Sequence, residues 1–190
     1  MKHATNIIYM KKKIEPLVID NFLDEQSFQV LQKIMLGYDF GWFYNNQIDY
    51  SDDVNKFQFI HLFYQDNIGI NSDSYLILNT IIDKLKPKEI IRIKANLLTR
   101  TLDVAVNNFH VDVDLDSIKD LPLKTNVKTA IFYINTNNGY TEFEDGSTVK
   151  SIENRMVIFP SDISHRGTSC TDQNTRVVIN FNYLQDYIGQ

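Results

Sequence analysis

Residues 156–183 read MVIFPSDISHRGTSCTDQNTRVVINFNY, and this stretch decides the fold. Two runs rich in β-branched and aromatic residues, Met156–Phe159 and Arg176–Tyr183, flank a polar segment with a Pro-Ser-Asp turn. Such runs favour strands because their side chains pack well on a pleated surface. The stretch therefore predicts two strands separated by a turn-rich connection.

Similar runs recur through the second half of the chain. They are Ile90–Leu98, Lys128–Asn135 and Tyr140–Phe143. Short strands separated by polar turns are typical of a β-sandwich or jelly roll. Because helices are expected first and strands later, without a regular alternation of the two, we predict a mostly β protein with an antiparallel sheet and flanking helices.

The first half of the chain predicts two helices and two strands. The segment Pro16–Leu23 is typical of a strand and turn, and Asp24 can cap a helix that Gly37 ends. The apolar residues at helical spacing in this first helix are Phe28, Leu31, Ile34 and Met35. A second helix is expected over Tyr75–Leu85, and Phe57–Tyr64 indicates an aromatic strand.

Length and composition narrow the class of protein. With 190 residues, 43% of them hydrophobic, we expect one domain over 1–190, with helical support over about 1–88 and a jelly-roll core over about 89–185. A net charge of -5 gives no overall basic field, so no nucleic acid partner is expected. No apolar run is long enough for a membrane span, and the single cysteine, Cys170, favours the reducing cytoplasm.

Three residues suggest a metal site. His110 and Asp112 are separated by one residue, so on an extended segment both side chains leave from the same face. His165 supplies a third ligand. Two imidazoles and one carboxylate form the facial triad of non-haem Fe(II) oxygenases, which leaves coordination positions open.

Arg176 follows His165 by eleven positions, at the start of the last predicted strand. Pairing of the two segments as a hairpin would bring its guanidinium near the metal. A buried arginine requires an anion, and its planar fork matches a carboxylate. The alternative is an arginine on an edge strand that pairs with a surface aspartate.

Taken in order, these segments make the chain resemble the 2-oxoglutarate-dependent Fe(II) oxygenases, in the branch similar to prolyl 4-hydroxylases. The segments that carry the resemblance are His110-Val111-Asp112, Ala130 to Asn135, Gly139 to Phe143, Arg155 to Pro160, His165-Arg166-Gly167 and Arg176. The resemblance implies a double-stranded β-helix core of the jelly-roll, cupin-like type, with the metal ligands at its open mouth.

Carried over position by position, the resemblance implies that His110, Asp112 and His165 bind and activate the metal as catalytic iron ligands. Arg176 would bind the distal carboxylate of 2-oxoglutarate, and Tyr133 would donate a hydrogen bond to the same group. Many relatives have Ser or Thr two positions after the arginine, whereas this chain has Val178, so Tyr133 is expected to supply the hydroxyl. The presence of an acid at position 112 disfavours halogenation.

The reaction implied is oxidative decarboxylation of 2-oxoglutarate by O2 to succinate and CO2, coupled to hydroxylation of a substrate, with ascorbate as a reductant. The substrate is open between a peptidyl proline and a small molecule. Two alternatives keep the fold without this reaction: a cupin-like metal- or sugar-binding domain, and a catalytically silent interaction domain. Arg176 and Tyr133 separate the first from the oxygenase, because neither is needed without a bound 2-oxoacid.

Further polar residues are candidates for the cavity wall. Arg92, Lys94 and Asn96 share one face of a predicted strand, where the alternative is a solvated surface. Asn108 and Asn180 stand two positions before the first histidine ligand and four after the arginine, so regular strands would turn them to the same sides. Of these, Asn96 and Asn180 are predicted to contact the co-substrate.

Other polar and aromatic residues are assigned no role in the site. His61 is expected to be a hydrogen-bonded sheet histidine, and His3 part of a terminal segment. The segment Trp42–Tyr44 forms either a lid or, in the favoured interpretation, core packing. A calcium loop beginning at Asp112 is rejected, because Ser117 and Leu123 stand where glycine and glutamate are required.

Overall fold

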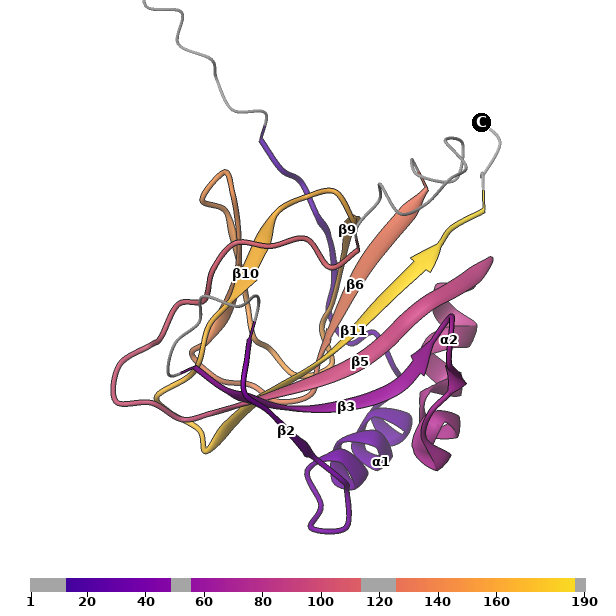
Figure 1. The fold of residues 1–190 in the computed structure, drawn as a ribbon, viewed down its shortest axis with the longest axis horizontal. Coiled ribbons are helices and arrows are strands. Elements are labelled where there is room, and N and C mark those ends of the chain that lie inside the picture. The colour runs from indigo at the N-terminus through magenta and orange to yellow at the C-terminus, as the bar shows by residue number, and fades with distance from the viewer. Residues whose placement is uncertain (1–12, 49–55, 114–125, 187–190) are drawn as a thin grey trace, which may run out of the picture.

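Two β-sheets face each other in the computed structural model, which describes residues 13–48, 56–113 and 126–186. The major sheet has the strand order β1-β9-β6-β11-β5-β3-β2, with β4 paired to β3, and the minor sheet has the order β10-β7-β8. Figure 1 shows β10 on one side of the open barrel and β11 and β5 on the other. The arrangement is the predicted jelly roll, with antiparallel pairing throughout.

The strands of the major sheet are β1 (Leu17–Ile19), β2 (Phe43–Asn45), β3 (Gln58–Gln65), β4 (Gly69–Ile70), β5 (Glu89–Thr99), β6 (Val127–Tyr133), β9 (Met156–Pro160) and β11 (Thr175–Leu184). Those of the minor sheet are β7 (Tyr140–Phe143), β8 (Thr148–Lys150) and β10 (His165–Gly167). All the strand positions predicted from apolar runs are confirmed. The strands β2, β4 and β8 were not predicted individually, because runs of two or three residues are too short to show an alternating pattern.

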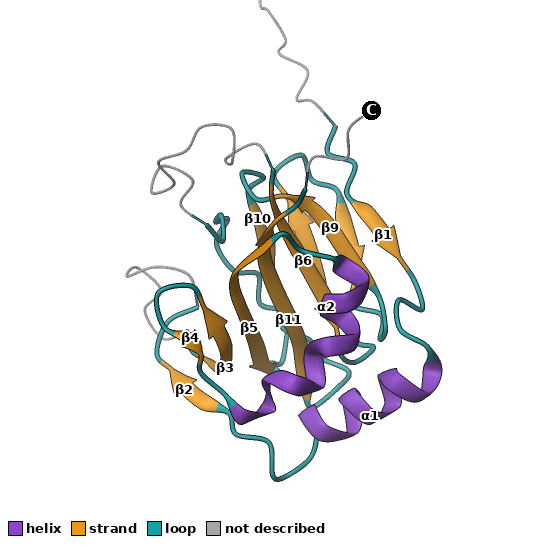
Figure 2. Cartoon of the chain, turned by 90° about the vertical axis from the view of Figure 1, so that its right-hand side faces the viewer, coloured by secondary structure: helices purple, strands orange, loops and turns teal. Residues whose placement is uncertain are grey.

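Two helices cover one face of the major sheet, as Figure 2 shows. The helix α1 spans Glu25–Met35, and the carboxylate of Asp24 accepts a hydrogen bond of 2.9 Å from the backbone N–H of Ser27, as the predicted cap requires. The second predicted helix is only partly correct. Asp73–Leu78 form a 3-10 helix, η1, and the α-helix α2 begins at Asn79 and ends at Leu85.

The reason for this difference lies at the start of the segment. The side chain of Ser72 caps η1 and its carbonyl accepts from the N–H of Tyr75, three residues on, which sets 3-10 rather than α-helical spacing. Leu76 is consequently 70% exposed instead of contributing to an apolar stripe.

The hydrophobic core fills the space between the helices and the major sheet. Its members include Phe28, Leu31, Met35, Ile81, Ile93, Ala95, Phe132, Val177 and Ile179. The rings of Phe22 and Phe28 each meet the ring of Phe132 at a centroid distance of 6.1 Å. Because strand side chains alternate, the residues between these on β5 and β11 face the minor sheet instead. That alternation places the polar residues of both strands inside the barrel.

The structure also tests what was predicted for the aromatic segment Trp42–Tyr44. Phe43 and Tyr44 are 63% and 65% exposed, so core packing was wrong for both, and only Trp42 packs against the core. They lie on β2, the edge strand of the major sheet, where no helix covers them. His3, Asp114, Asp116, Ser117 and Leu123 lie outside the described residues. Among the residues that are described, no helix has the length and apolar character needed to cross a membrane.

Candidate metal centre and its cavity

His110 and His165 face each other directly across an isolated antiparallel bridge. The backbone N–H of each donates to the carbonyl of the other, at 2.9 and 3.0 Å, and the two ring centroids are 4.9 Å apart. Such hydrogen-bonded pairs project both side chains to the same side of a sheet. The backbone pairing therefore brings together two imidazoles that are far apart in sequence.

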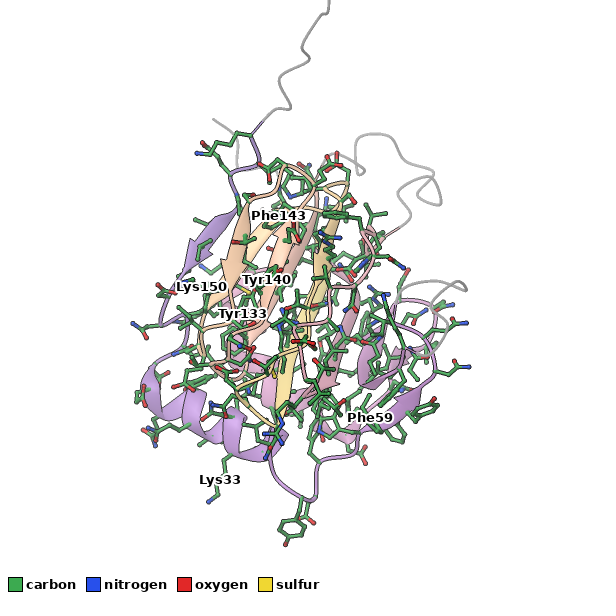
Figure 3. All side chains as sticks on the ribbon, turned by 90° about the vertical axis from the view of Figure 1, so that its left-hand side faces the viewer. Lys33, Phe59, Tyr133, Tyr140, Phe143 and Lys150 are labelled. Atoms are coloured by element: carbon green, nitrogen blue, oxygen red, sulfur yellow. The ribbon has the colours of Figure 1, made fainter. Side chains whose placement is uncertain are left out.

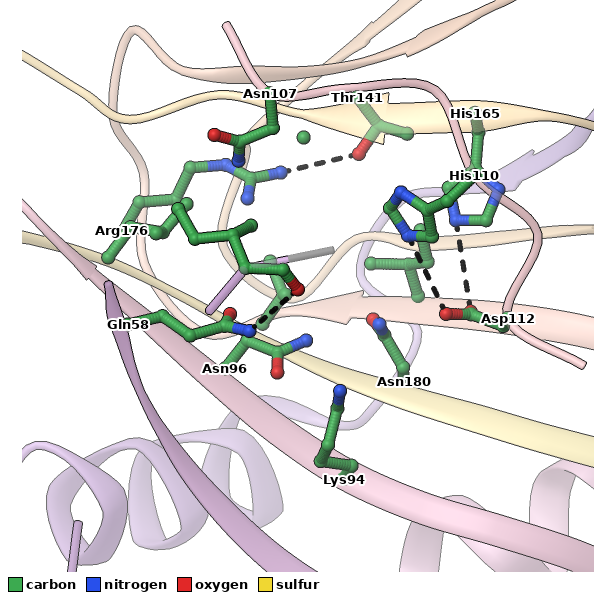
Figure 4. A pocket seen from close by; sticks show the side chains of 15 residues that line it. Gln58, Lys94, Asn96, Asn107, His110, Asp112, Thr141, His165, Arg176 and Asn180 are labelled. Atoms are coloured by element: carbon green, nitrogen blue, oxygen red, sulfur yellow. Dashed lines mark hydrogen bonds and ion pairs between the residues drawn. The ribbon is translucent and has the colours of Figure 1, made fainter. Parts of the chain in front are cut away.

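Asp112 completes the predicted triad. Its Oδ1 lies 3.8 Å from Nε2 of His110, and its Oδ2 lies 3.8 Å from Nε2 of His165 (Figure 4). All three ligand atoms lie within 4.8 Å of one another. This spacing allows one ion to contact all three, and the donor set of two nitrogens and one oxygen suits Fe(II).

The tautomer of each histidine favours metal binding. Nδ1 of His110 lies 3.2 Å from the carbonyl oxygen of Asn108, and Nδ1 of His165 lies 3.2 Å from that of Ile163. A carbonyl oxygen only accepts, so Nδ1 is the donor at both contacts, and each Nε2 is the nitrogen that faces the carboxylate of Asp112. The protein thus prepares both imidazoles as ligands.

The carboxyl group of Asp112 is ionised in this environment. Burial by itself would raise its pKa, but electrostatic interactions with His165, Arg92 and His110 outweigh burial and lower the pKa below its ordinary value. A deprotonated carboxylate is the form in which this side chain can act as a metal ligand.

Arg176 lies at the other end of the same cavity and is only 4% exposed. Its Nε donates to Oγ of Ser151 at 2.8 Å, and one terminal nitrogen donates to Oγ1 of Thr141 at 3.3 Å. Its guanidinium also lies 5.7 Å from the ring centroid of Tyr133. All these partners are neutral, and within the described residues no carboxylate forms an ion pair with Arg176. Burial accordingly lowers the pKa of the guanidinium.

Two glycines leave the space that Arg176 occupies. A Cβ at Gly139 would lie 2.7 Å from Cδ of Arg176 and 2.7 Å from the carbonyl oxygen of Ser169. A Cβ at Gly167 would lie 3.4 Å from a terminal nitrogen of the guanidinium. A buried cation with only neutral partners is costly, so this end of the cavity fits a carboxylate ligand.

The route by which Arg176 reaches the cavity differs from the prediction. His165 and Arg176 do not form a hairpin, because β10 pairs with β7 while β11 pairs with β5 and β6. The two residues belong to opposite sheets and approach each other across the barrel interior. The alternative of an edge-strand arginine on the surface is also wrong, because β11 is a central strand.

Tyr133 and Thr141 form a hydroxyl pair beside Arg176. Tyr133 is fully buried and donates to Oγ1 of Thr141 at 2.8 Å, and burial raises its pKa. Thr141 lines the cavity, whereas Tyr133 does not. Because the Thr141 oxygen accepts from both Tyr133 and Arg176, its own proton remains to be donated into the cavity. The role expected of Tyr133 stays a prediction, with Thr141 between it and the cavity.

Polar residues of β5 and β11 form the cavity wall opposite the minor sheet. Lys94, Asn96 and Asn180, which were candidates for the wall, all line it. The Oδ1 atoms of Asn96 and Asn180 are buried, and neither has a hydrogen-bond partner in the part of the chain that the structure describes. Buried acceptors of this kind are normally satisfied, so a ligand or water with a donor group fits here.

Two of the polar candidates behave differently from the prediction. Asn108 is exposed, and its neighbour Asn107 lines the cavity instead, because the segment before His110 is not a regular strand. Arg92 is not on the wall of this cavity but donates from a terminal nitrogen to Oδ1 of Asp112 at 3.2 Å.

Sequence analysis missed four contributors to the site: Thr141, Ser151, Asn107 and Asn182. The alternation along Tyr140–Phe143, which turns Thr141 to the same face as Phe143, was the local signal in the sequence that could have found Thr141. His61 is the hydrogen-bonded sheet histidine that was expected, with Nδ1 2.6 Å from the carbonyl of Gly41 and Nε2 2.7 Å from Oγ of Ser72.

At the level of sequence, no protein-family model and no curated protein matches the chain. Solved structures do. A prolyl hydroxylase from Trichoplax adhaerens, in complex with a peptide fragment of a hypoxia-inducible factor oxygen degradation domain, is 18% identical with a TM-score of 0.57, covering 89% of this chain and 83% of its own. A prolyl-4-hydroxylase from Pseudomonas putida is 13% identical with a TM-score of 0.55, covering 90% and 92%.

The α-ketoglutarate-dependent epimerase SnoN from nogalamycin biosynthesis is 11% identical with a TM-score of 0.59, covering 90% of this chain and 78% of its own. The three structures share the jelly-roll fold of 2-oxoglutarate- and iron-dependent enzymes, including the branch of prolyl hydroxylases. At these identities the comparisons establish the fold of the chain.

Proposed function

We propose that the chain is an Fe(II)- and 2-oxoglutarate-dependent dioxygenase that acts as a hydroxylase. The observation that carries the proposal is the composition of one cavity. A triad of two histidines and an aspartate stands at one end, and a buried arginine with only neutral partners stands at the other. A dicarboxylate that chelates a metal with one end and carries a free carboxylate at the other matches both.

Each residue then has a definite task. His110, Asp112 and His165 would hold iron through Nε2 and carboxylate oxygen atoms. Arg176 would bind the distal carboxylate of 2-oxoglutarate, and the free proton of Thr141 would be donated to the same carboxylate. Tyr133 orients Thr141 by its hydrogen bond. Together the iron and 2-oxoglutarate supply the oxidising chemistry, in which O2 converts 2-oxoglutarate to succinate and CO2 and the substrate is hydroxylated.

The conditions that this reaction requires agree with the composition of the chain. The reducing cytoplasm proposed from the single cysteine, together with ascorbate as a reductant, would keep the iron in its ferrous state. Halogenation is not proposed, because Asp112 occupies the carboxylate position of the triad.

The substrate is proposed as either a peptidyl proline or a small molecule. The Trichoplax prolyl hydroxylase is described with a peptide fragment, and SnoN is described with Fe3+, α-ketoglutarate and nogalamycin RO. The jelly roll thus serves both kinds of substrate. In this chain most of the residues that line the cavity are polar, and the acceptors of Asn96 and Asn180, which have no partner among the described residues, favour a ligand that carries hydroxyl or amide N–H donors.

An anaerobic titration tests the proposal directly. Purified protein stripped of metal is titrated with Fe(II) and then with 2-oxoglutarate, while the visible absorption of a chelated 2-oxoacid is followed. A band that saturates with 2-oxoglutarate supports the co-substrate, and Arg176→Met, which removes the cation but retains the metal ligands, should shift the titration to higher concentration. Iron binding without any band would instead favour a cupin-like metal-binding domain.

A further inference from the structure

We propose that Arg92 and Asn182 are positioning residues that hold the Asp112 carboxylate in place for the metal, so that metal affinity depends on them. The inference deepens the proposed function and rests on its metal site. Neither residue touches the metal position or the 2-oxoglutarate end of the cavity. Their contribution would act through Asp112.

Arg92 and Asn182 lie opposite each other on two neighbouring strands in the interior of the major sheet. Arg92 on β5 and Asn182 on β11 are direct cross-strand partners, next to a register shift between Asn182 and Tyr183. Their side chains face the barrel interior. Asp112 belongs to no strand and lies two residues after His110, which forms the bridge to His165. The pair therefore links the major sheet to the segment that carries the carboxylate.

Hydrogen bonds close a ring between the three side chains. Arg92 donates from Nε to Oδ1 of Asn182 at 3.1 Å and from a terminal nitrogen to Oδ1 of Asp112 at 3.2 Å. Asn182 donates from Nδ2 to Oδ2 of Asp112 at 3.3 Å and to Oγ1 of Thr129 at 3.1 Å. Each carboxylate oxygen thus accepts one bond from this pair, which sets the plane of the carboxylate.

Burial makes this ring a constraint rather than a surface contact. Asn182 and Thr129 are fully buried, and the side chain of Asp112 is 5% exposed. Inside a protein such bonds are stronger than in water, and an unpaired donor or acceptor is costly. The carboxylate therefore has one preferred orientation, and that orientation points its oxygens toward Nε2 of both histidines.

Charge and orientation act in opposite directions at Arg92. Its positive charge attracts the Asp112 carboxylate but also repels a metal cation, so loss of the charge would mix two effects. Asn182 is neutral and acts by orientation alone. Asn182→Ala, and Arg92→Lys with its charge retained, are therefore the informative changes.

The test measures metal affinity, not turnover. Dissociation constants for Co(II) and Fe(II) are determined anaerobically by competition with a chelator, and the visible Co(II) spectrum reports coordination. We expect Asn182→Ala to weaken metal binding by about 10- to 100-fold, the usual effect of removing a group that orients a metal ligand. Arg92→Lys should weaken it by about 10-fold, because lysine cannot bridge Asp112 and Asn182.

Arg155→Lys is the matched control. Arg155 also forms a two-pronged pair with an aspartate, Asp20, but on the outer surface. The substitution Arg155→Lys should leave metal affinity unchanged. If Asn182→Ala does not fold, Thr129→Val removes the bond that anchors Asn182, together with the contact between the hydroxyls of Thr129 and Ser161, and should give a smaller loss in the same direction.

The outcomes separate the inference from the proposed function. If the wild-type protein binds no divalent metal, the proposed function fails. If it binds metal and either Asn182→Ala or Arg92→Lys binds equally tightly, the inference alone is overturned. A lower melting temperature of the metal-free variant with unchanged metal affinity would likewise assign the pair a purely structural role and contradict the inference.

Discussion

The two ends of the cavity are built on different principles. At the metal end the carboxylate of Asp112 is already bonded on both oxygens, and both imidazoles are set by backbone carbonyls. At the opposite end Arg176 has a full charge and only neutral partners. The first end is organised before any ligand arrives, and the second is left short of one negative charge. An asymmetric ligand that contributes that charge would complete the cavity.

The largest expected effect comes from removing a metal ligand. His110→Ala and His165→Ala should each abolish Fe(II)-dependent turnover of 2-oxoglutarate, because two remaining ligands cannot hold the ion in the same geometry. Succinate formation measures the loss, and circular dichroism tests whether the fold is retained. Undiminished turnover in either variant would remove that histidine from the site.

Removal of the positive charge at the other end should affect 2-oxoglutarate binding without affecting metal binding. Arg176→Met is expected to weaken 2-oxoglutarate binding by about 100-fold, as for removal of one partner from a buried charge pair. Metal affinity should not change, because the hydrogen bonds of Arg176 go to Ser151 and Thr141 and it lies at the opposite end of the cavity. Both constants come from the same anaerobic titration. Equal loss of metal affinity would mean that the two ends are not independent.

The hydroxyl pair beside Arg176 offers a finer test. Thr141→Val retains the shape but removes the oxygen that lines the cavity, and should weaken 2-oxoglutarate binding by about 10-fold, the effect of one hydrogen bond to a charged group. Tyr133→Phe should cost only about 2- to 3-fold, because its hydroxyl acts through Thr141. A larger effect for Tyr133→Phe would restore the direct role predicted from the sequence.

The smallest effect is expected from the glycines around the guanidinium. Gly167→Ala would place a methyl group 3.4 Å from the Arg176 terminal nitrogen and should weaken 2-oxoglutarate binding by a few-fold, with stability nearly unchanged. Gly139→Ala would place a methyl group 2.7 Å from both Cδ of Arg176 and the backbone carbonyl oxygen of Ser169, and should in addition lower the free energy of unfolding by about 1–3 kcal/mol. Thermal melts and the titration distinguish the two variants. A reversed order would contradict the packing around Arg176.

Local pattern accounts for what could be predicted. The strands Glu89–Thr99, Val127–Tyr133 and Thr175–Leu184 follow from apolar runs, and alternation along them predicted that Lys94 shares a face with Asn96, and Asn180 with Arg176. The same reasoning failed for Asn108. The segment before His110 pairs with its neighbour only through isolated bridges, at Val106 and at His110, so strict alternation does not hold between them.

The sequence by itself indicated the three candidate metal ligands, the strands and the polar faces of two strands, because these depend on short-range spacing and on the two-residue period of a strand. Only the tertiary structure decided that Arg176 enters from the opposite sheet, that Thr141 rather than Tyr133 lines the cavity, and that Arg92 and Asn182 hold Asp112. These contacts join residues 20 to 70 positions apart and depend on how two sheets pack, which no local pattern records.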